Sequence, residues 1–403
     1  MILKLGASNF KTWVLPLSVV LLAFALRVYR LDFFSLRGDE AFTVIFVQRT
    51  WEGLWKGIST IEPNPPLMYL ALRAWVAVAG ASEFAARYFA VFFGVLGVPL
   101  LYRLAREMFT ASVIARHKNQ IALIAAFLIA INPYQIWHSQ DVRNYTQWPA
   151  LSLLALIFFW RWWRLELARP HLPFVIFNLS FYVLATLAAL YTHYYDVFIL
   201  AALNLCVFGW TIWDRRWRTL ARWVAAQIVL VALYAPWVLF GTNRITTYGE
   251  ASAEKSVPLL EQFSRTLATF ALGDTVPDAW KTLAWLPLAF ALILVLAWLA
   301  RQDKMRATFF ALWLAIPSLA LYAISMGRPL FLERYLNGVA PAYYLAFALG
   351  INAILNSQHA LRTTHYALHS PPSPCFCSSA RPQFRCGIII SNRCMPKRRT
   401  GAR

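Results

Sequence analysis

The sequence predicts an all-α membrane protein, a polytopic bundle of about ten transmembrane helices, and three observations lead to this fold class. Of the 403 residues, 60% are hydrophobic and only 14% are charged. A soluble protein usually has about a quarter charged residues. Aromatic residues make up 16% of the chain and gather at the ends of apolar runs, as they do at bilayer interfaces. Runs long enough to cross a hydrocarbon core of roughly 30 Å recur along the chain.

The apolar runs define the predicted spans, because about 20 apolar residues cross the membrane as a helix. The spans are expected at 13–29, 84–103, 120–137, 145–163, 173–192, 195–213, 220–240, 283–300, 307–324 and 338–355. The first run lacks a small-residue cleavage site, so we expect it to be a retained helix that also acts as the targeting signal.

The basic residues indicate how these helices are oriented. They cluster in alternate connections between the runs: Lys4 and Lys11; Arg103, Arg106, Arg116 and Lys118; Arg161, Arg164 and Arg169; Arg215, Arg216, Arg218 and Arg222; Arg301, Lys304 and Arg306. If all ten runs span, every cluster lies on one side, which is then cytoplasmic. The net charge of +20 therefore reflects membrane orientation, and we predict no nucleic-acid binding. We expect a multi-pass protein of the plasma (inner) membrane with both termini in the cytoplasm.

The first outer loop, 30–82, holds the stretch Leu36-Arg-Gly-Asp-Glu-Ala-Phe42. After it, apolar residues alternate with polar ones in a pattern typical of a helix that lies in the membrane interface, predicted over Ala41–Trp55. Asn64-Pro-Pro66 interrupts the chain, and a second surface helix is expected over Leu67–Val78.

Asp39 and Glu40 in this loop are the candidate catalytic residues. Two carboxylates at a membrane surface can supply a general base, a metal ligand or a helix cap, and Asp39 is well suited to cap a helix that begins at Ala41. Neighbouring helical side chains point about 100° apart, so the two cannot serve one atom equally. We favour Asp39, partly buried and with a raised pKa, as the base that deprotonates an acceptor hydroxyl. Glu40 would then hold a metal ion or orient the loop.

Basic and aromatic residues on the same outer face are candidates for binding a phosphate. Arg143 lies in a short turn next to Tyr145, where it is either an ion-paired residue at a helix end or a guanidinium that binds a phosphate through two hydrogen bonds. Arg328, Arg334 and Tyr335 form a similar group, although Glu333 could pair with one of these arginines. Two such cations would stabilise the charge on a departing phosphate.

Two further residues of this face are secondary candidates. His193 ends a membrane helix in a tyrosine-rich turn, where it is either an interfacial residue or a ligand and phosphate donor. Asn64 and the two prolines after it are expected to shape the loop.

At this point the chain resembles a known family. Leu36–Phe42 resembles the Asp-Glu loop of membrane glycosyltransferases related to protein O-mannosyltransferases and lipid A aminoarabinose transferases. Four more elements follow in the family's order: Asn64-Pro-Pro-Leu-Met-Tyr69, Ser139-Gln-Asp-Val-Arg-Asn-Tyr145, Tyr191-Thr-His-Tyr194 and Arg334-Tyr335 followed by Pro341. Asp141 stands where the family usually has Glu.

The resemblance implies a glycosyltransferase-C fold with catalysis on the outer face. It implies Asp39 as the catalytic carboxylate, Glu40 as its partner, and Arg143 and Arg334 near the donor phosphate. The leading hypothesis is inverting transfer of a mannose-like or related sugar from a polyprenyl-phosphate donor to a hydroxyl of a protein or glycolipid acceptor. No cofactor is certain, but a divalent metal ion near Asp39 or Glu40 would neutralise phosphate charge. A transporter or lipid flippase, or a truncated inactive relative, are the alternatives.

The end of the chain differs from the rest, so we divide it into a transmembrane domain, 1–356, and a basic tail, 357–403. The tail has no acidic residue and no spanning run, which predicts either disorder or a shifted reading frame. Cys375, Cys377, Cys386 and Cys394 invite comparison with a zinc site, but their spacing matches no usual ligand pattern.

Overall fold

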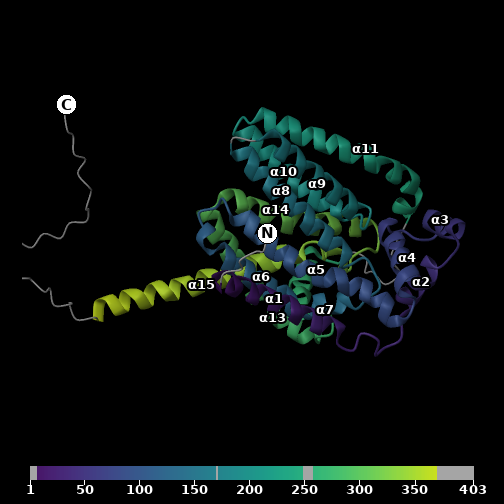
Figure 1. Ribbon diagram of the computed structural model, residues 1–403, viewed down its shortest axis with the longest axis horizontal. Helices are drawn as coiled ribbons and strands as arrows, with labels where there is room; N and C mark the ends of the chain where they lie inside the picture. Colours follow the sequence, from purple (N-terminus) through teal and green to yellow (C-terminus); the bar gives the residue numbers. More distant parts are fainter. Residues whose placement is uncertain (1–6, 169–170, 248–256, 370–403) are drawn as a thin grey trace, which may run out of the picture. The chain divides into compact units, whose positions relative to one another are not determined.

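The computed structural model describes residues 7–168, 171–247 and 257–369, and every regular element in these ranges is helical (Figure 1). The α-helices are α1 (Ala7–Val28), α2 (Gly38–Val47), α3 (Trp51–Thr60), α4 (Leu67–Ala79), α5 (Glu83–Phe109), α6 (Lys118–Ile131), α7 (Pro133–Ser139), α8 (Gln147–Leu167), α9 (Leu172–Leu190), α10 (Asp196–Trp213), α11 (Trp217–Thr247), α12 (Leu259–Leu272), α13 (Asp278–Gln302), α14 (Lys304–Gly327) and α15 (Ala340–His369). Two 3₁₀ turns, η1 (Ala115–His117) and η2 (Glu333–Leu336), complete the set. The predicted all-α fold class is confirmed.

Six of the described helices are long and apolar enough to cross a membrane: α5, α9, α10, the 217–240 part of α11, α13 and α14. The count reaches seven if the bent pair formed by 115–131 and α7 is one span. The predicted count of ten is therefore not confirmed. The apolar part of α1, Trp13–Val28, is shorter than these six helices.

The run predicted as one span over 120–137 is broken between α6 and α7, whose axes differ by 60°. Pro133 has no backbone N–H to continue the α6 hydrogen bonds. Asn132 caps the new helix, because its Oδ1 accepts a hydrogen bond from the Gln135 amide at 3.0 Å. The break turns the chain towards the segment 139–145.

The first loop contains three helices where the sequence predicted two. The predicted helix Ala41–Trp55 is wrong as one element, since α2 ends at Val47 and α3 begins at Trp51. Thr50 starts the new helix, because its hydroxyl accepts a hydrogen bond from the Gly53 amide at 3.1 Å. The second predicted helix is present as α4, which follows Pro66.

These loop helices have a hydrophobic core of their own. Phe46 of α2, Leu54 of α3 and Leu72 of α4 are fully buried and pack in one cluster with Phe89 of α5 and Trp237 of α11. In Figure 1 the helices α2, α3 and α4 lie close together beside one end of α11. Burial of these side chains fixes the loop helices on the bundle, because each buried large apolar side chain contributes about 1.5–3 kcal/mol.

A buried arginine joins α1 to the helices that carry the 139–145 turn. Arg27 donates hydrogen bonds to the Ile129 carbonyl at 3.0 Å, the Ala130 carbonyl at 2.8 Å and the Ser139 hydroxyl at 3.1 Å. Gln140 donates in the other direction, to the carbonyl of Arg27 at 3.0 Å. The start of the turn is thus fixed to the first helix, whose end leads into α2.

Grouped by the contacts within the chain, the residues form two compact units, Met1–Asn356 and Ser357–Arg403. Helix α15 continues past the predicted start of the tail to His369. The four tail cysteines and the rest of the predicted tail, together with Lys4 and Arg169, lie outside the described residues.

Candidate active site

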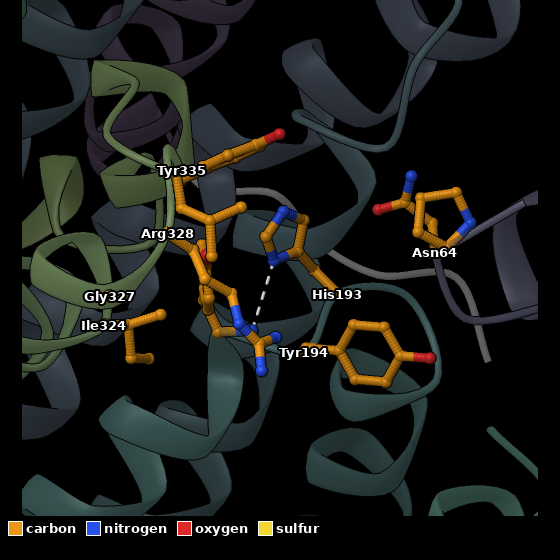
Figure 2. A pocket seen from close by; sticks show the side chains of 10 residues that line it. Asn64, His193, Tyr194, Ile324, Gly327, Arg328 and Tyr335 are labelled. Carbon is orange, nitrogen blue, oxygen red and sulfur yellow. Dashed lines mark hydrogen bonds between the residues drawn. The ribbon is translucent and has the colours of Figure 1, made fainter. Parts of the chain in front are cut away.

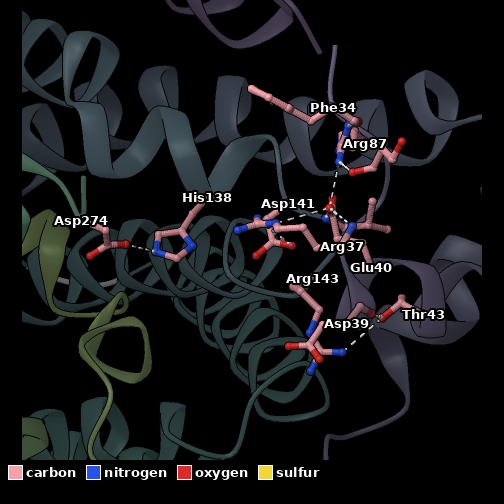
Figure 3. Close-up of polar contacts among 12 residues, drawn as sticks. Phe34, Arg37, Asp39, Glu40, Thr43, Arg87, His138, Asp141, Arg143 and Asp274 are labelled. Carbon is pink, nitrogen blue, oxygen red and sulfur yellow. Dashed lines mark hydrogen bonds and ion pairs between the residues drawn. The ribbon is translucent and has the colours of Figure 1, made fainter. Parts of the chain in front are cut away.

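Glu40 is fixed by an arginine on α5 that the sequence analysis did not single out. The Arg87 side chain donates to both Glu40 oxygens, from Nε to Oε1 at 2.9 Å and from Nη2 to Oε2 at 2.8 Å (Figure 3). It also donates to three carbonyls of the loop, those of Leu31, Phe34 and Ser35, at 2.6–3.1 Å. These five hydrogen bonds use all five N–H groups of a guanidinium.

The backbone completes the surroundings of Glu40. Its Oε2 accepts from the Arg37 amide at 3.0 Å and its Oε1 from the Val142 amide at 3.3 Å. Burial raises the pKa of the Glu40 carboxyl, but the hydrogen bonds from Arg87 and Arg37 outweigh it, so the pKa lies below its ordinary value. With 1% of its surface exposed and its oxygens occupied, Glu40 orients the loop and joins it to the 139–145 turn.

Asp39 differs from two of the sequence-based expectations. Its side chain is exposed, not partly buried. It does not cap α2 either, because the helix begins at Gly38 and Glu40 takes the amide of the residue before the helix. Asp39 therefore lies in the first helical turn with its carboxylate accessible, and the exposed α2 N-terminus favours that negative charge.

Thr43 connects the Asp39 turn to Arg143. The Thr43 hydroxyl donates to the Asp39 carbonyl at 2.7 Å and accepts from Arg143 Nη1 at 3.1 Å (Figure 3). Thr43 is fully buried and Arg143 is half-buried. The guanidinium of Arg143 is thereby held beside the helix that carries Asp39.

Three segments of the chain hold the turn around Arg143. The Asn144 side chain donates to the Thr192 carbonyl at 2.8 Å, and the Thr146 hydroxyl donates to the Ala90 carbonyl at 2.9 Å. Asn337 donates to the Tyr145 carbonyl at 2.7 Å and accepts from Gln135 at 2.7 Å. The 139–145 turn is therefore a rigid centre to which α5, the 191–195 turn and the 328–337 loop are all attached.

Asp141 in this turn is a candidate that sequence reasoning missed. It is 9% exposed, and its Oδ1 lies 3.8 Å from Arg37 Nη2. Burial raises the pKa of the Asp141 carboxyl to about 6, against the opposing charges of Arg37, Arg143 and Arg334. The signal in the sequence was an acidic residue two positions before Arg143, in a turn between apolar runs.

Arg334 and Tyr335 reach the same centre from η2. The guanidinium carbon of Arg334 lies 5.6 Å from the Tyr145 ring centroid and 5.9 Å from that of Tyr335, which is within the range of cation–π contacts. Glu333 points to a different arginine, since its Oε1 accepts from Arg265 Nε at 2.9 Å. Glu333 thus forms an ion pair with Arg265 of α12.

A cavity of about 470 Å³ brings together four of the sequence-predicted residues, Asn64, His193, Arg328 and Tyr335 (Figure 2). Its other lining residues are apolar or aromatic, apart from the glycine and proline of the adjoining loops. The Tyr145 ring packs against His193, with centroids 6.3 Å apart, and the Arg334 guanidinium lies over the Tyr145 and Tyr335 rings. Arg143, Asp39 and Glu40 are not among the described residues that line the cavity.

His193 is held as a neutral imidazole at the wall of this cavity. Its ring stacks on Trp148, with centroids 4.1 Å apart, and the Tyr195 amide donates to its Nδ1 at 3.2 Å. Burial, together with the charge of Arg143, lowers the pKa of His193 to about 3. Because Nδ1 accepts a hydrogen bond, the proton of the neutral ring is on Nε2, which can donate to a ligand.

A metal site at the Asp39–Glu40 pair does not fit the described residues. No three His, Cys, Asp or Glu side chains there come together in a way that could hold a metal ion. The oxygens of Glu40 already accept four hydrogen bonds. We therefore derive no step through a metal ion.

The fold of this chain resembles that of several solved structures. No protein-family model and no curated protein matches the sequence. ArnT from Cupriavidus metallidurans superposes with a TM-score of 0.60 at 15% identity, over 90% of this chain and 64% of the ArnT chain. The same protein bound to undecaprenyl phosphate gives 0.58 at 16% identity, with the same coverage. The archaeal oligosaccharyltransferase AglB from Archaeoglobus fulgidus, in complex with an inhibitory peptide and a dolichol-phosphate, gives 0.57 at 12% identity, over 91% of this chain and 53% of that one.

The chain shares their fold. The fold implied by the sequence motifs is thereby confirmed. The chain spans 64% of the length of ArnT and about half that of AglB.

Proposed function

We propose that the chain is an integral-membrane glycosyltransferase of the plasma membrane that moves a sugar from a polyprenyl phosphate to an acceptor hydroxyl at the outer face. The observation that carries the proposal is a cavity lined by Arg328, His193 and Tyr335, with Arg334 over the Tyr335 ring, within a fold shared with a protein that binds undecaprenyl phosphate. The acceptor is a hydroxyl of a protein or a glycolipid, and the sugar is a mannose-like hexose or a related one.

The donor would bind with its phosphate near the arginines. Arg328 lines the cavity, Arg143 lies within electrostatic range of His193 beside it, and Arg334 lies over the Tyr145 and Tyr335 rings. Guanidinium groups bind phosphate oxygens through paired hydrogen bonds, and His193 Nε2–H adds a neutral donor. The apolar and aromatic walls suit an isoprenoid chain.

The chemistry would be a single displacement. The acceptor oxygen attacks the anomeric carbon, the bond from that carbon to the phosphate oxygen breaks, and the lipid phosphate leaves with the electron pair. The accessible carboxylate of Asp39 takes the proton of the acceptor, and the configuration inverts. Arg143 and Arg334 stabilise the charge that grows on the leaving phosphate, while Glu40 and Arg87 keep the α2 turn in place.

The test is release of lipid phosphate by purified protein in lipid nanodiscs supplied with polyprenyl-phosphate mannose, glucose or aminoarabinose. We expect the wild type to release lipid phosphate and Asp39→Asn to be slower by about 10²–10⁴-fold, which is what general base catalysis supplies. Asp32→Asn, an exposed carboxylate of the same loop, is the matched control and should retain full activity.

Two results would contradict the proposal. Full activity of Asp39→Asn would remove Asp39 from the mechanism. Movement of the lipid across a sealed vesicle by wild type, with no transfer or release of sugar from any donor, would instead identify a flippase.

A further inference from the structure

A second cavity, of about 500 Å³, lies between α12, the start of α13 and η2. Its lining is polar, in contrast to that of the cavity beside His193, Arg328 and Tyr335, which we call the aromatic cavity. Eight of the nine described residues that line the second cavity have charged or hydroxyl side chains, and we call it the polar cavity. Three of these residues carry hydroxyls. The others are three carboxylates (Glu261, Asp278 and Glu333), two cations (Arg265 and Lys281) and one aromatic ring (Trp285).

The charges of this polar cavity are largely balanced within the protein. Arg265 Nε donates to Glu333 at 2.9 Å, and its Nη1 lies 3.7 Å from Glu261. Lys281 donates to the Asp274 carbonyl at 3.2 Å and lies 3.8 Å from Asp278. The side chains of Lys281 and Glu333 are only 17% and 16% exposed, so the cavity holds them close to their partners.

This composition limits the class of ligand. The three carboxylates repel an anion such as a phosphate, and the two cations repel the positive charge of a simple amine. An apolar chain would desolvate these polar groups and offer them no hydrogen bonds. A neutral molecule with many hydroxyls meets none of these penalties, because each hydroxyl both donates to a carboxylate and accepts from Arg265 or Lys281. The Trp285 ring can cover the C–H face of a sugar.

Its position relates this cavity to the donor site. Glu333 and Tyr335 are two residues apart in η2, yet Glu333 lines the polar cavity and Tyr335 lines the aromatic one. Arg334 between them lies over the Tyr145 ring. One 3₁₀ turn thus separates the two cavities, and its middle residue belongs to the proposed phosphate site.

We propose that the polar cavity binds an uncharged, hydroxyl-rich saccharide, and that this saccharide is the acceptor. The acceptor role rests on the proposed function, whereas saccharide binding does not. Among the possible acceptors, the inference therefore favours a glycan over a peptide.

The experiment is saturation-transfer NMR on the full-length protein in nanodiscs, without donor, using methyl α-D-mannopyranoside, methyl β-D-glucopyranoside and N-acetylglucosamine as probes. We expect saturable binding of at least one probe. Lys281→Met and Trp285→Ala should each weaken that binding at least fivefold. Trp280→Ala is the matched control, because Trp280 lies on the same helix, is 64% exposed and is not among the described lining residues.

Absence of binding by all three probes, or equal binding by wild type, Lys281→Met and Trp285→Ala, would overturn the site. Two variants are used so that misfolding of one does not decide the result. Addition of polyprenyl-phosphate sugar then tests the acceptor role. A bound probe that is never glycosylated by a preparation that does release lipid phosphate would overturn that role. A preparation that binds the probe but releases no lipid phosphate contradicts the proposed function and leaves the saccharide site standing.

Discussion

The Arg87 guanidinium contacts both carboxylate oxygens of Glu40, at 2.9 and 2.8 Å, across 47 positions of sequence (Figure 3). Both side chains are almost fully buried, at 6% and 1% exposure. The pair joins α2 to α5, and the remaining Arg87 donors hold the backbone that leads from α1 into α2. The position of the proposed catalytic residue next to Glu40 therefore depends on an ion pair that does not touch the substrate.

Glu40→Gln should strongly destabilise the protein. The change leaves a buried guanidinium without its counter-charge, and breaking such a pair costs about 3–5 kcal/mol. Thermal unfolding in detergent measures the effect, with Glu52→Gln, an exposed carboxylate on α3, as the control. Unchanged stability of Glu40→Gln would show that Arg87 does not need this partner.

Asp141→Asn should stabilise the protein at high pH. The folded-state pKa of Asp141 is raised to about 6, so the folded protein binds this proton more tightly than the unfolded chain does. The contribution of Asp141 to stability is therefore lost as the pH rises through the window from about 4 to about 6, by up to about 3 kcal/mol. Asn has no charge to lose.

The measurement is the midpoint of thermal unfolding at pH 5 and pH 8. We expect Asp141→Asn to melt above wild type at pH 8 and the difference to shrink at pH 5. A variant that is less stable than wild type at pH 8 would mean that the arginines around Asp141 outweigh its burial. Lower transferase activity in the more stable variant would indicate that Asp141 is kept for function.

His193→Phe should weaken donor binding without changing the pH profile. Phenylalanine keeps the stack on Trp148 but removes the Nε2–H donor, and one hydrogen bond is worth about 0.5–1.5 kcal/mol, or roughly 2- to 10-fold in affinity. Since the pKa of His193 is about 3, its titration does not contribute between pH 5 and pH 8. Donor KM measured across this range tests both statements, and loss of an activity step near pH 6–7 in the variant would contradict them.

Much of this architecture could be predicted from the sequence because it depends on local patterns. Apolar runs predict membrane helices, and the motif that contains Asp39 and Glu40 predicted the position of the loop. The sequence pattern could not show that Asn132 and Pro133 break a span or that Thr50 starts a new helix. In both places the outcome depends on whether a side chain caps a new helix or the preceding helix continues.

The site was predictable only in part, because partners far apart in the sequence decide its electrostatics. Asp39 lies exposed in the first turn of α2, whereas Asp141 is covered by neighbouring elements, and this burial raises the pKa of the Asp141 carboxyl to about 6. Arg87 gave a weak signal, as a cation one turn into an apolar helix. Its five acceptors could not be inferred without the fold.

Thr43→Val provides the most specific test of how Arg143 is held. Valine matches the shape of threonine but lacks the hydroxyl that accepts from Arg143 Nη1. The guanidinium would therefore lose its 3.1 Å hydrogen bond to α2 while keeping its charge. We expect transferase kcat to fall about 5- to 20-fold, because a misplaced cation stabilises the leaving phosphate less well.

Arg143→Gln removes the charge itself and should lower kcat about 10²–10³-fold. Thr60→Val, which removes a hydroxyl on the exposed side of α3, is the matched control. If Thr43→Val lowered activity as much as Arg143→Gln, the hydroxyl would act on the substrate directly, and if it had no effect, the orientation of Arg143 would be fixed by the 139–145 turn alone.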